Sequence, residues 1–450
     1  MLHFTHVKVI YLYLLLAICT NSQDSTAIKV PEYHRLPPLR EQAAIQDAWR
    51  DQRISNIPHI LQKYGVDAWL MSQKEYAEDT VFWSLKRATQ FSARRRTTQL
   101  FFANATEPIK PVYTWIDNTP EVWESLLDVL ETQDPKTIAV NVDAEVAFSS
   151  GMHAGEYGKI KNRLGRKWNE RLVSEPMIAV ECIGTMVKDR LPWYRKLQET
   201  AWAIIEEGFS ERVITPGETT TEDVEWWMRS KIQELNYTTW FQPSVSILDG
   251  RDPFENLTTS DQMTTINFGH VLHVDFGVTA MGLNTDTQHL AYVLYPGEDE
   301  SDIPQGLLNG LKNANRVQDI VKSNMKVGVS GNEILKACLK QMESEGISGR
   351  VYSHPIGDWG HSAGTLIGMF NLQDDVPVLG DLPLLHNTYY SVELYAQYFV
   401  PERNATMTFY LEEDIYWIGE EEGWDWVYGQ QKEFHLVKPP LSDLFRVQGL

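Results

Sequence analysis

The sequence is poor in positive charge. Its 450 residues contain 40 Lys and Arg against 61 Asp and Glu, which gives a formal net charge of −21. A nucleic-acid-binding protein needs clustered positive charge to displace counterions, and Arg94-Arg95-Arg96 is the one strongly basic run. We therefore expect no nucleic-acid partner. The 43 % hydrophobic content is enough for a large core and excludes a disordered or fibrous chain.

Long hydrophobic runs are scarce as well. Residues 9–19 form a short apolar segment that follows Lys8 and precedes a small polar run. This arrangement is typical of a secretory signal peptide, and the segment is too short to span a bilayer comfortably. We expect a signal peptide over residues 1–22 and a secreted, extracellular chain that leaves the membrane once the signal is removed. Four sequons fit this route as N-glycan sites: Asn104, Asn236, Asn256 and Asn404.

Cysteine is the third scarcity. The sequence has three cysteines, and Cys19 belongs to the expected signal peptide. The remaining two, Cys182 and Cys338, could form a disulfide in an oxidising compartment or stay as buried free thiols. The sequence favours neither alternative.

The rest of the chain divides near Pro192. Residues 23–190 alternate helical and apolar segments, as in an α/β layer. We expect helices over 39–53 and 54–64 and strands over 66–72, 97–103 and 136–142. This region shows no catalytic constellation. Residues 191–440 form the second expected domain.

The second domain contains the same plan twice, about 110 residues apart. Helices are expected at 194–209 and 305–324, and each is followed by a segment with capping-box spacing. The two boxes are Thr219-x-x-Glu222 and Ser330-x-x-Glu333. Each unit ends in two strands joined by a turn, which is typical of a duplicated half-domain.

The first hairpin, residues 270–294, has the two-residue period of a strand. A turn at Ala280-Met281 would place Asp275 directly opposite Asp286 on one face. Opposed like charges destabilise a sheet unless a cation lies between them. The pair therefore predicts one divalent metal ion or a pair of ions.

The second hairpin, residues 389–418, repeats this feature. A turn at residues 401–404 places Glu393 opposite Glu412. Between the hairpins, His361 lies on a Gly-rich bend and adds an imidazole to the four carboxylates. This donor set suits two divalent ions, with Mn²⁺ favoured and Co²⁺ or Zn²⁺ as alternatives.

These elements together resemble the metal-ligand motifs of the pita-bread metallopeptidases, which include Xaa-Pro aminopeptidases, prolidases, methionine aminopeptidases and creatinase. The matching pieces are Asp275-x10-Asp286, Gly360-His361, Val392-Glu393 and Leu411-Glu412-Glu413-Asp414. The resemblance implies an α+β fold. A pita-bread catalytic domain of duplicated halves would follow an α/β creatinase/prolidase-type N-terminal domain.

The resemblance also implies roles for these residues. Asp275 and Asp286 would bind or bridge metal, Glu412 would bridge, and His361 and Glu393 would complete the second site. Glu393 would also carry a proton to the leaving amine. The implied function is a secreted dinuclear metallohydrolase, an Xaa-Pro aminopeptidase or dipeptidase, that takes small peptides and forms a homodimer.

Three histidines of the family pattern are missing. Thr258, Gly357 and Gly368 stand where the family carries histidines that bind substrate or stabilise the tetrahedral intermediate. His354 and His273 are the candidates to replace them as catalytic groups. The departures leave two alternatives open: a creatinase-like C–N hydrolase acting on a small molecule, and a metal-binding homologue without catalysis.

A serine hydrolase is a remote further alternative. The segment GHSAG, residues 360–364, fits a G-x-S-x-G nucleophile elbow with Ser362 as nucleophile and His386 or His435 as base. An elbow follows a buried strand, and the residues before this one are interrupted by Pro355 and Gly357. The sequence also contains no Walker A motif, dinucleotide fingerprint or HExxH helix.

Overall fold

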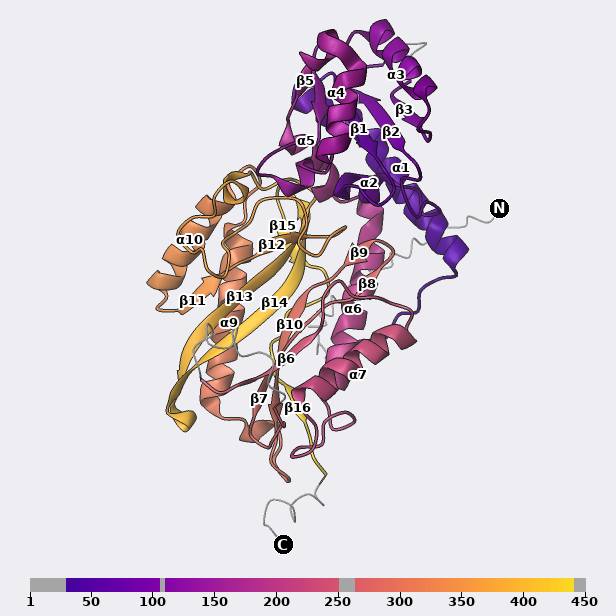
Figure 1. Ribbon diagram of the computed structural model, residues 1–450. Helices are drawn as coiled ribbons and strands as arrows, with labels where there is room; N and C mark the ends of the chain where they lie inside the picture. Colours follow the sequence, from indigo (N-terminus) through magenta and orange to yellow (C-terminus); the bar gives the residue numbers. More distant parts are fainter. Residues whose placement is uncertain (1–29, 106–109, 251–263, 441–450) are drawn as a thin grey trace, which may run out of the picture.

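The computed structural model describes residues 30–105, 110–250 and 264–440 (Figure 1). The expected signal peptide, the sequon at Asn256 and Thr258 lie outside these ranges. In the part of the chain that is described, no helix is both long and apolar enough to cross a membrane.

The N-terminal domain is built on a mixed five-stranded sheet with strand order β3-β2-β1-β4-β5. Strand β1 runs antiparallel to β2 and parallel to β4. Alternate residues of β1 enter different cores, because Trp69 packs with helices α1 and α5 and Leu70 with α3 and α4. The elements are α1 (Leu39–Lys63), β1 (Ala68–Gln73), α2 (Thr80–Leu85), β2 (Thr97–Phe102), β3 (Val112–Trp115), α3 (Pro120–Gln133), β4 (Ile138–Val140), α4 (Ala154–Asn169), β5 (Leu172–Val173) and α5 (Pro176–Gly184).

Helix α1 is one continuous helix, so the prediction of two helices over 39–53 and 54–64 was wrong. Pro58 lies inside it and removes one backbone donor. The buried residues Trp49, Arg53, Ile57 and Ile60 continue along one face past this point. Packing of that face compensates for the lost hydrogen bond and keeps the helix whole.

The C-terminal domain is built on a nine-stranded sheet with the central order β11-β13-β14-β10-β7-β6. Four helices cover one face of it (Figure 1). The helices are α6 (Leu191–Gly208), α7 (Thr221–Glu234), α9 (Gln305–Asn324) and α10 (Gly331–Ser344). The strands are β6 (Ser244–Leu248), β7 (Val271–Phe276), β10 (Thr287–Val293), β11 (Ser348–Val351), β12 (His354–Ile356), β13 (Tyr389–Val400), β14 (Ala405–Gly419), β15 (Gly423–Trp426) and β16 (His435–Val437), with the short pair β8 (Thr279–Ala280) and β9 (Leu283–Asn284) forming a separate two-stranded sheet.

The two halves of this domain begin their second helices in the same way. Ser330 caps α10 and forms a capping box with Glu333, as predicted. In the first half the box lies one residue later than expected, between Thr220 and Asp223. The hydroxyl of Thr219 instead accepts a hydrogen bond from the backbone of Thr215 at 2.9 Å.

The register of the first hairpin differs from the prediction. Asp275 lies opposite Gln288, not opposite Asp286. The turn residues are Met281 and Gly282, whose φ angles of 54° and 73° suit a two-residue hairpin turn with both central residues left-handed. The observed partner of each residue lies two positions further along the chain than the predicted one. Because a shift of two residues preserves the alternation of a strand, every side chain keeps its face. Asp286 therefore stays on the same side of the sheet as Asp275, displaced along the strand.

The second hairpin has the predicted register. Glu393 pairs with Glu412, and Val400 pairs with Ala405 across a turn that ends at left-handed Asn404. The two cysteines are both free and buried, in separate cores, which decides against the disulfide alternative.

Candidate metal centre

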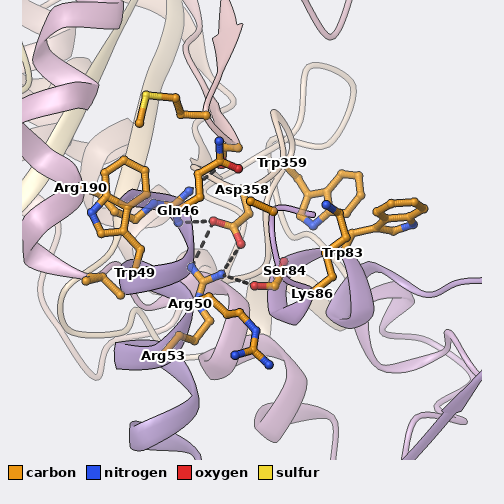
Figure 2. A pocket seen from close by; sticks show the side chains of 14 residues that line it. Gln46, Trp49, Arg50, Arg53, Trp83, Ser84, Lys86, Arg190, Asp358 and Trp359 are labelled. Carbon is orange, nitrogen blue, oxygen red and sulfur yellow. Dashed lines mark hydrogen bonds and ion pairs between the residues drawn. The ribbon is translucent and has the colours of Figure 1, made fainter. Parts of the chain in front are cut away.

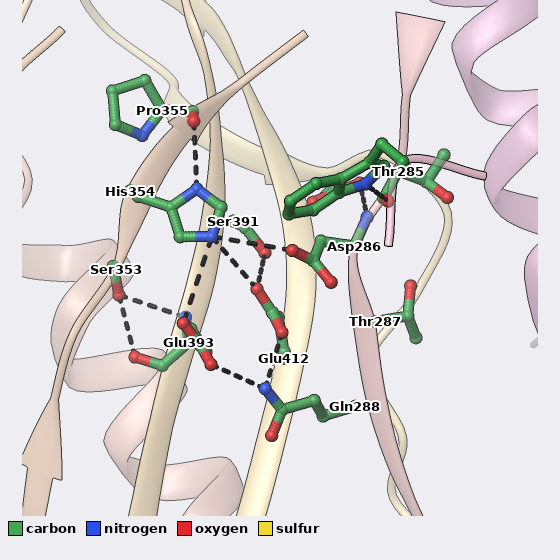
Figure 3. Close-up of polar contacts among 12 residues, drawn as sticks. Thr285, Asp286, Thr287, Gln288, Ser353, His354, Pro355, Ser391, Glu393 and Glu412 are labelled. Carbon is green, nitrogen blue, oxygen red and sulfur yellow. Dashed lines mark hydrogen bonds and ion pairs between the residues drawn. The ribbon is translucent and has the colours of Figure 1, made fainter. Parts of the chain in front are cut away.

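The face of the large sheet opposite the four helices gathers four acidic side chains, three of which, Asp286, Glu393 and Glu412, are labelled in Figure 3. Helices cover the opposite face through residues such as Val274 and Leu411, so their neighbours Asp275 and Glu412 point the other way. The strand order β13-β14-β10-β7 places the contributing strands side by side. The four are Asp275 on β7, Asp286 directly before β10, Glu393 on β13 and Glu412 on β14.

His354, at the start of β12, faces three of these carboxylates. Its Nε2 lies 3.4 Å from Glu412 Oε1, 3.7 Å from Asp286 Oδ2 and 4.0 Å from Glu393 Oε2 (Figure 3). Its Nδ1 lies 3.0 Å from the carbonyl oxygen of Pro355. A carbonyl only accepts, so Nδ1 is the donor in this contact, and Nε2 is the ring nitrogen that faces the carboxylates.

The group has the features of a cation site. Among the described residues, Asp275 Oδ1, Asp286 Oδ1 and His354 Nε2 are buried atoms without a hydrogen-bond partner. Burial, with repulsion from Glu412, raises the pKa of Asp275, Asp286 and Glu393 well above the usual values. Asp286, His354 and Glu412 each have one ligand atom within 4.8 Å of the others. Carboxylate oxygens with one neutral imidazole fit a divalent metal of the Mn²⁺, Co²⁺ or Zn²⁺ class.

Gln288 belongs to this centre, although the sequence analysis missed it. Its Nε2 donates to Glu393 Oε1 at 2.6 Å and to Glu412 Oε2 at 2.8 Å. The available signal was its spacing, because a residue two positions after Asp286 on a strand shares its face. On the other side, the Ser391 hydroxyl donates to Glu412 Oε1 at 2.6 Å.

His273, one of the two expected catalytic histidines, lies behind Gln288. Its Nε2 donates to Gln288 Oε1 at 2.9 Å, and its Nδ1 lies 3.3 Å from the Ser246 hydroxyl. Burial lowers its pKa to about 4, so the ring is neutral at pH 7. His273 therefore does not contact the carboxylates itself; it binds Gln288, whose amide donates to Glu393 and Glu412.

His361 lies at the mouth of the site rather than among the carboxylates. Its exposed ring stands edge-on to His354, with centroids 4.7 Å apart, and also packs on Trp240. The Gly-rich bend turns back here, because the amide of Ser362 donates to the carbonyl of Pro355 at 2.9 Å. The structure thus brings His354, not His361, to the position that the sequence analysis gave to the imidazole ligand.

A second polar cluster fills the helix-covered side of the sheet. Glu413 Oε1 lies 2.8 Å from His289 Nε2, Glu413 Oε2 accepts from the indole of Trp202 at 3.1 Å, and His289 contacts His435 at 3.0 Å. His435 therefore contacts His289 in this cluster and does not serve as the base for Ser362. The other expected base, His386, pairs with Glu420 instead. The serine-hydrolase alternative has no triad among the described residues.

Comparison with known proteins identifies the family. Residues 193–433 match the model of metallopeptidase family M24. A search of curated proteins finds no match.

Several solved structures share the fold. An X-Pro aminopeptidase from Thermotoga maritima is 15 % identical with a TM-score of 0.57, over 83 % of this chain and 98 % of that one. An Xaa-Pro dipeptidase from Bacillus anthracis is 14 % identical with a TM-score of 0.54, over 86 % and 100 % of the two chains. An aminopeptidase P variant from Escherichia coli is 12 % identical with a TM-score of 0.55, over 89 % and 99 %. With the family model covering more than half of its length, the chain belongs to metallopeptidase family M24, a family of metallohydrolases with the pita-bread fold.

Proposed function

We propose that the protein hydrolyses Xaa-Pro peptides as an aminopeptidase or dipeptidase that depends on divalent metal. The observation that carries the proposal is the buried group of Asp286, His354 and Glu412, with Glu393 and Asp275 beside it and donor atoms left without partners. The substrate class is supported by the solved structures with this fold, which include an X-Pro aminopeptidase and an Xaa-Pro dipeptidase.

We propose that these donors hold two ions. Asp286, His354, Glu393 and Glu412 would hold one, and Asp275 with Asp286 and Glu412 would hold the other. In this proposal His354 replaces His361 as the imidazole ligand, because its Nε2 faces the carboxylates. A bound divalent metal would lower the pKa of water, so that hydroxide would be available as the nucleophile near neutral pH.

The remaining chemistry is assigned to side chains of the chain itself. Glu393 is partly buried at the edge of the group, and Gln288 holds its Oε1, so Oε2 is the oxygen placed to move a proton toward the leaving amine. The exposed ring of His361 lies between His354 and the half-buried ring of Trp240, where it is suited to contact with a bound peptide. The contact from His354 Nδ1 to Pro355 holds the imidazole in orientation.

Hydrolysis of Xaa-Pro dipeptides and Xaa-Pro-Xaa tripeptides tests this function. The protein is stripped with chelator and reloaded with Mn²⁺, Co²⁺ or Zn²⁺, and Glu393→Gln is assayed with its metal content measured in parallel. Metal-dependent release of the first residue that is lost in the variant supports the proposal. Metal binding without peptide cleavage would instead favour a creatinase-like C–N hydrolase or a non-catalytic homologue. Failure to bind metal would refute the proposed centre.

We also propose that the protein is secreted, N-glycosylated and dimeric. Three of the four sequons, at Asn104, Asn236 and Asn404, lie on exposed residues of the described structure. Expression in a eukaryotic host tests the proposal through the N-terminal sequence of the protein in the medium, the mass lost on deglycosylation and light scattering. Retention inside the cell with residues 1–22 intact would refute secretion.

A further inference from the structure

The loop between His354 and His361 carries one buried carboxylate, Asp358, whose side chain is 8 % exposed. Two guanidinium groups hold it, one from Arg53 on α1 and one from Arg190 just before α6 (Figure 2). Arg53 binds both carboxylate oxygens, with Nη2 3.1 Å from Oδ1, and Arg190 binds Oδ1. The side chains of Arg53 and Arg190 are buried to a similar degree, at 7 % and 5 % exposed.

Each arginine is anchored in turn to a different element. Arg53 donates from Nη1 to the carbonyl oxygen of Ser84, at the end of α2, at 3.2 Å. Arg190 donates from Nη2 to the carbonyl oxygen of Gly282 at 2.6 Å. Gly282 lies in the turn of the first hairpin, four residues before Asp286. The cluster therefore joins the N-terminal domain to two segments that lead directly into the metal centre.

A direct bond also links these two segments. The backbone and the side-chain amide of Asn284 both donate to the carbonyl oxygen of Gly357, at 2.9 Å and 3.0 Å. Movement of the loop at Asp358 would therefore be transmitted to the chain leading into Asp286 as well as to His354. Close-packed interiors transmit such displacements because they have little free volume.

On one side, the loop that carries Asp358 borders an open cavity, so neighbouring side chains do not pack against it there. A cavity of about 250 Å³ lies against Arg53, Arg190 and Asp358 and is also lined by Trp49 and Trp359 (Figure 2). The loop could shift into this space if its ion pairs were lost. Although burial raises the pKa of Asp358, the charges of Arg190 and Arg53 outweigh burial and hold that pKa well below its ordinary value. The carboxylate is therefore ionised throughout the neutral range.

We propose that Asp358 is a positioning residue, which sets His354 and His361 in place through Arg53 and thereby makes the geometry of the metal centre depend on the N-terminal domain. This inference rests on the proposed metal-dependent function. Neither Asp358 nor Arg53 belongs to the donor group, so their effect would pass through the loop and the hairpin turn.

The test compares Asp358→Asn with a matched control in the intact protein. The control is Glu156→Gln, because Glu156 forms an ion pair with Arg96 (Nε to Oε1 2.6 Å) that is at least as buried and lies inside the N-terminal domain. Asp358→Asn leaves the buried guanidinium groups of Arg53 and Arg190 without their charge partner, and Glu156→Gln leaves that of Arg96, but only the first variant disturbs the loop. The readouts are thermal unfolding, Mn²⁺ affinity by calorimetry, kcat and KM on an Xaa-Pro tripeptide, and hydrogen exchange of residues 357–361.

We expect both variants to unfold at lower temperature, with Mn²⁺ affinity reduced about tenfold or more in Asp358→Asn alone. Wild-type affinity and kcat in folded Asp358→Asn, or an equal loss in Glu156→Gln, would overturn the inference. If Asp358→Asn does not fold, Arg53→Lys keeps the charge but loses the two-pronged contact, and the same comparison applies. If the wild-type protein binds no Mn²⁺, the proposed function fails, while faster exchange of 357–361 in Asp358→Asn alone would still show that Asp358 positions the loop.

Discussion

Gln288 lies directly opposite Glu412 in the sheet and donates its side-chain amide to Oε2 of that carboxylate at 2.8 Å. The same nitrogen reaches Glu393 at 2.6 Å. Glu393 and Glu412 are themselves paired across β13 and β14, so two acidic side chains would face each other without this donor. The amide offsets part of their repulsion and holds both carboxylates in one orientation.

Replacement of Gln288 by Met should weaken metal binding. The substitution keeps the length of the side chain but removes both hydrogen bonds that orient the carboxylates, so we expect Mn²⁺ affinity to fall about tenfold or more. Calorimetry measures the change. Gln318→Met is the control, because Gln318 is a fully buried glutamine on α9 that hydrogen-bonds to Gln430 away from the centre. Unchanged affinity in Gln288→Met would contradict the orienting role.

The two histidines of the Gly-rich segment should behave differently. His354→Ala removes the nitrogen that faces Asp286 and Glu412, so the protein should lose bound metal on dialysis. His361→Ala removes an exposed ring at the mouth, so metal content should stay near wild type while KM rises. Atomic emission gives the metal content of each variant. Loss of metal in His361→Ala with retention in His354→Ala would restore the assignment made from the sequence.

Acidification should destabilise the protein in part through His273. Burial lowers its folded-state pKa to about 4, whereas an unfolded histidine titrates near about 6.5. Between these values the unfolded chain binds more protons than the folded one, so this contribution to stability falls as pH drops through that window.

His273→Gln isolates that contribution. The amide can still donate to Gln288 but cannot take up a proton, so the melting temperature of the variant should fall less than that of wild type between pH 7 and pH 4. Differential scanning calorimetry of both metal-free proteins provides the comparison. Equal slopes for the two would show that His273 is not held neutral by burial.

Cys182 and Cys338 should be unreactive in the folded protein and reactive once it is unfolded. Cys182 and Cys338 are both buried and unpaired, and burial raises the pKa of each thiol to about 12. In a chain that lacks residues 1–22, and so Cys19, a thiol reagent should find almost no reactive group in the native state and two in denaturant without reductant. No free thiol after denaturation would indicate a disulfide and contradict this structure.

Local patterns were sufficient for much of the centre. The two-residue period of each hairpin placed Asp275 and Asp286 on one face and Glu393 and Glu412 on one face, and all four do meet in the structure. The register of the second hairpin was predicted because its long strands end at a clear turn. The first register was missed by two residues, since both Ala280-Met281 and Met281-Gly282 can form a short turn and only the left-handed φ values separate them.

By itself, then, the sequence determined the acidic residues of the centre, the faces they share and the duplicated plan around them, because strand periodicity and helix caps are local properties. Tertiary structure alone decided which histidine joins them, since His354 begins strand β12 and His361 lies on the bend after it, and their spacing in the sequence does not show which ring reaches the carboxylates. It also decided the contact of Gln288 with two strands and the ion pairs of Asp358 with Arg53, 305 residues away in the chain. Contacts between distant segments depend on how sheets and loops pack, and that packing leaves no repeating pattern in the sequence.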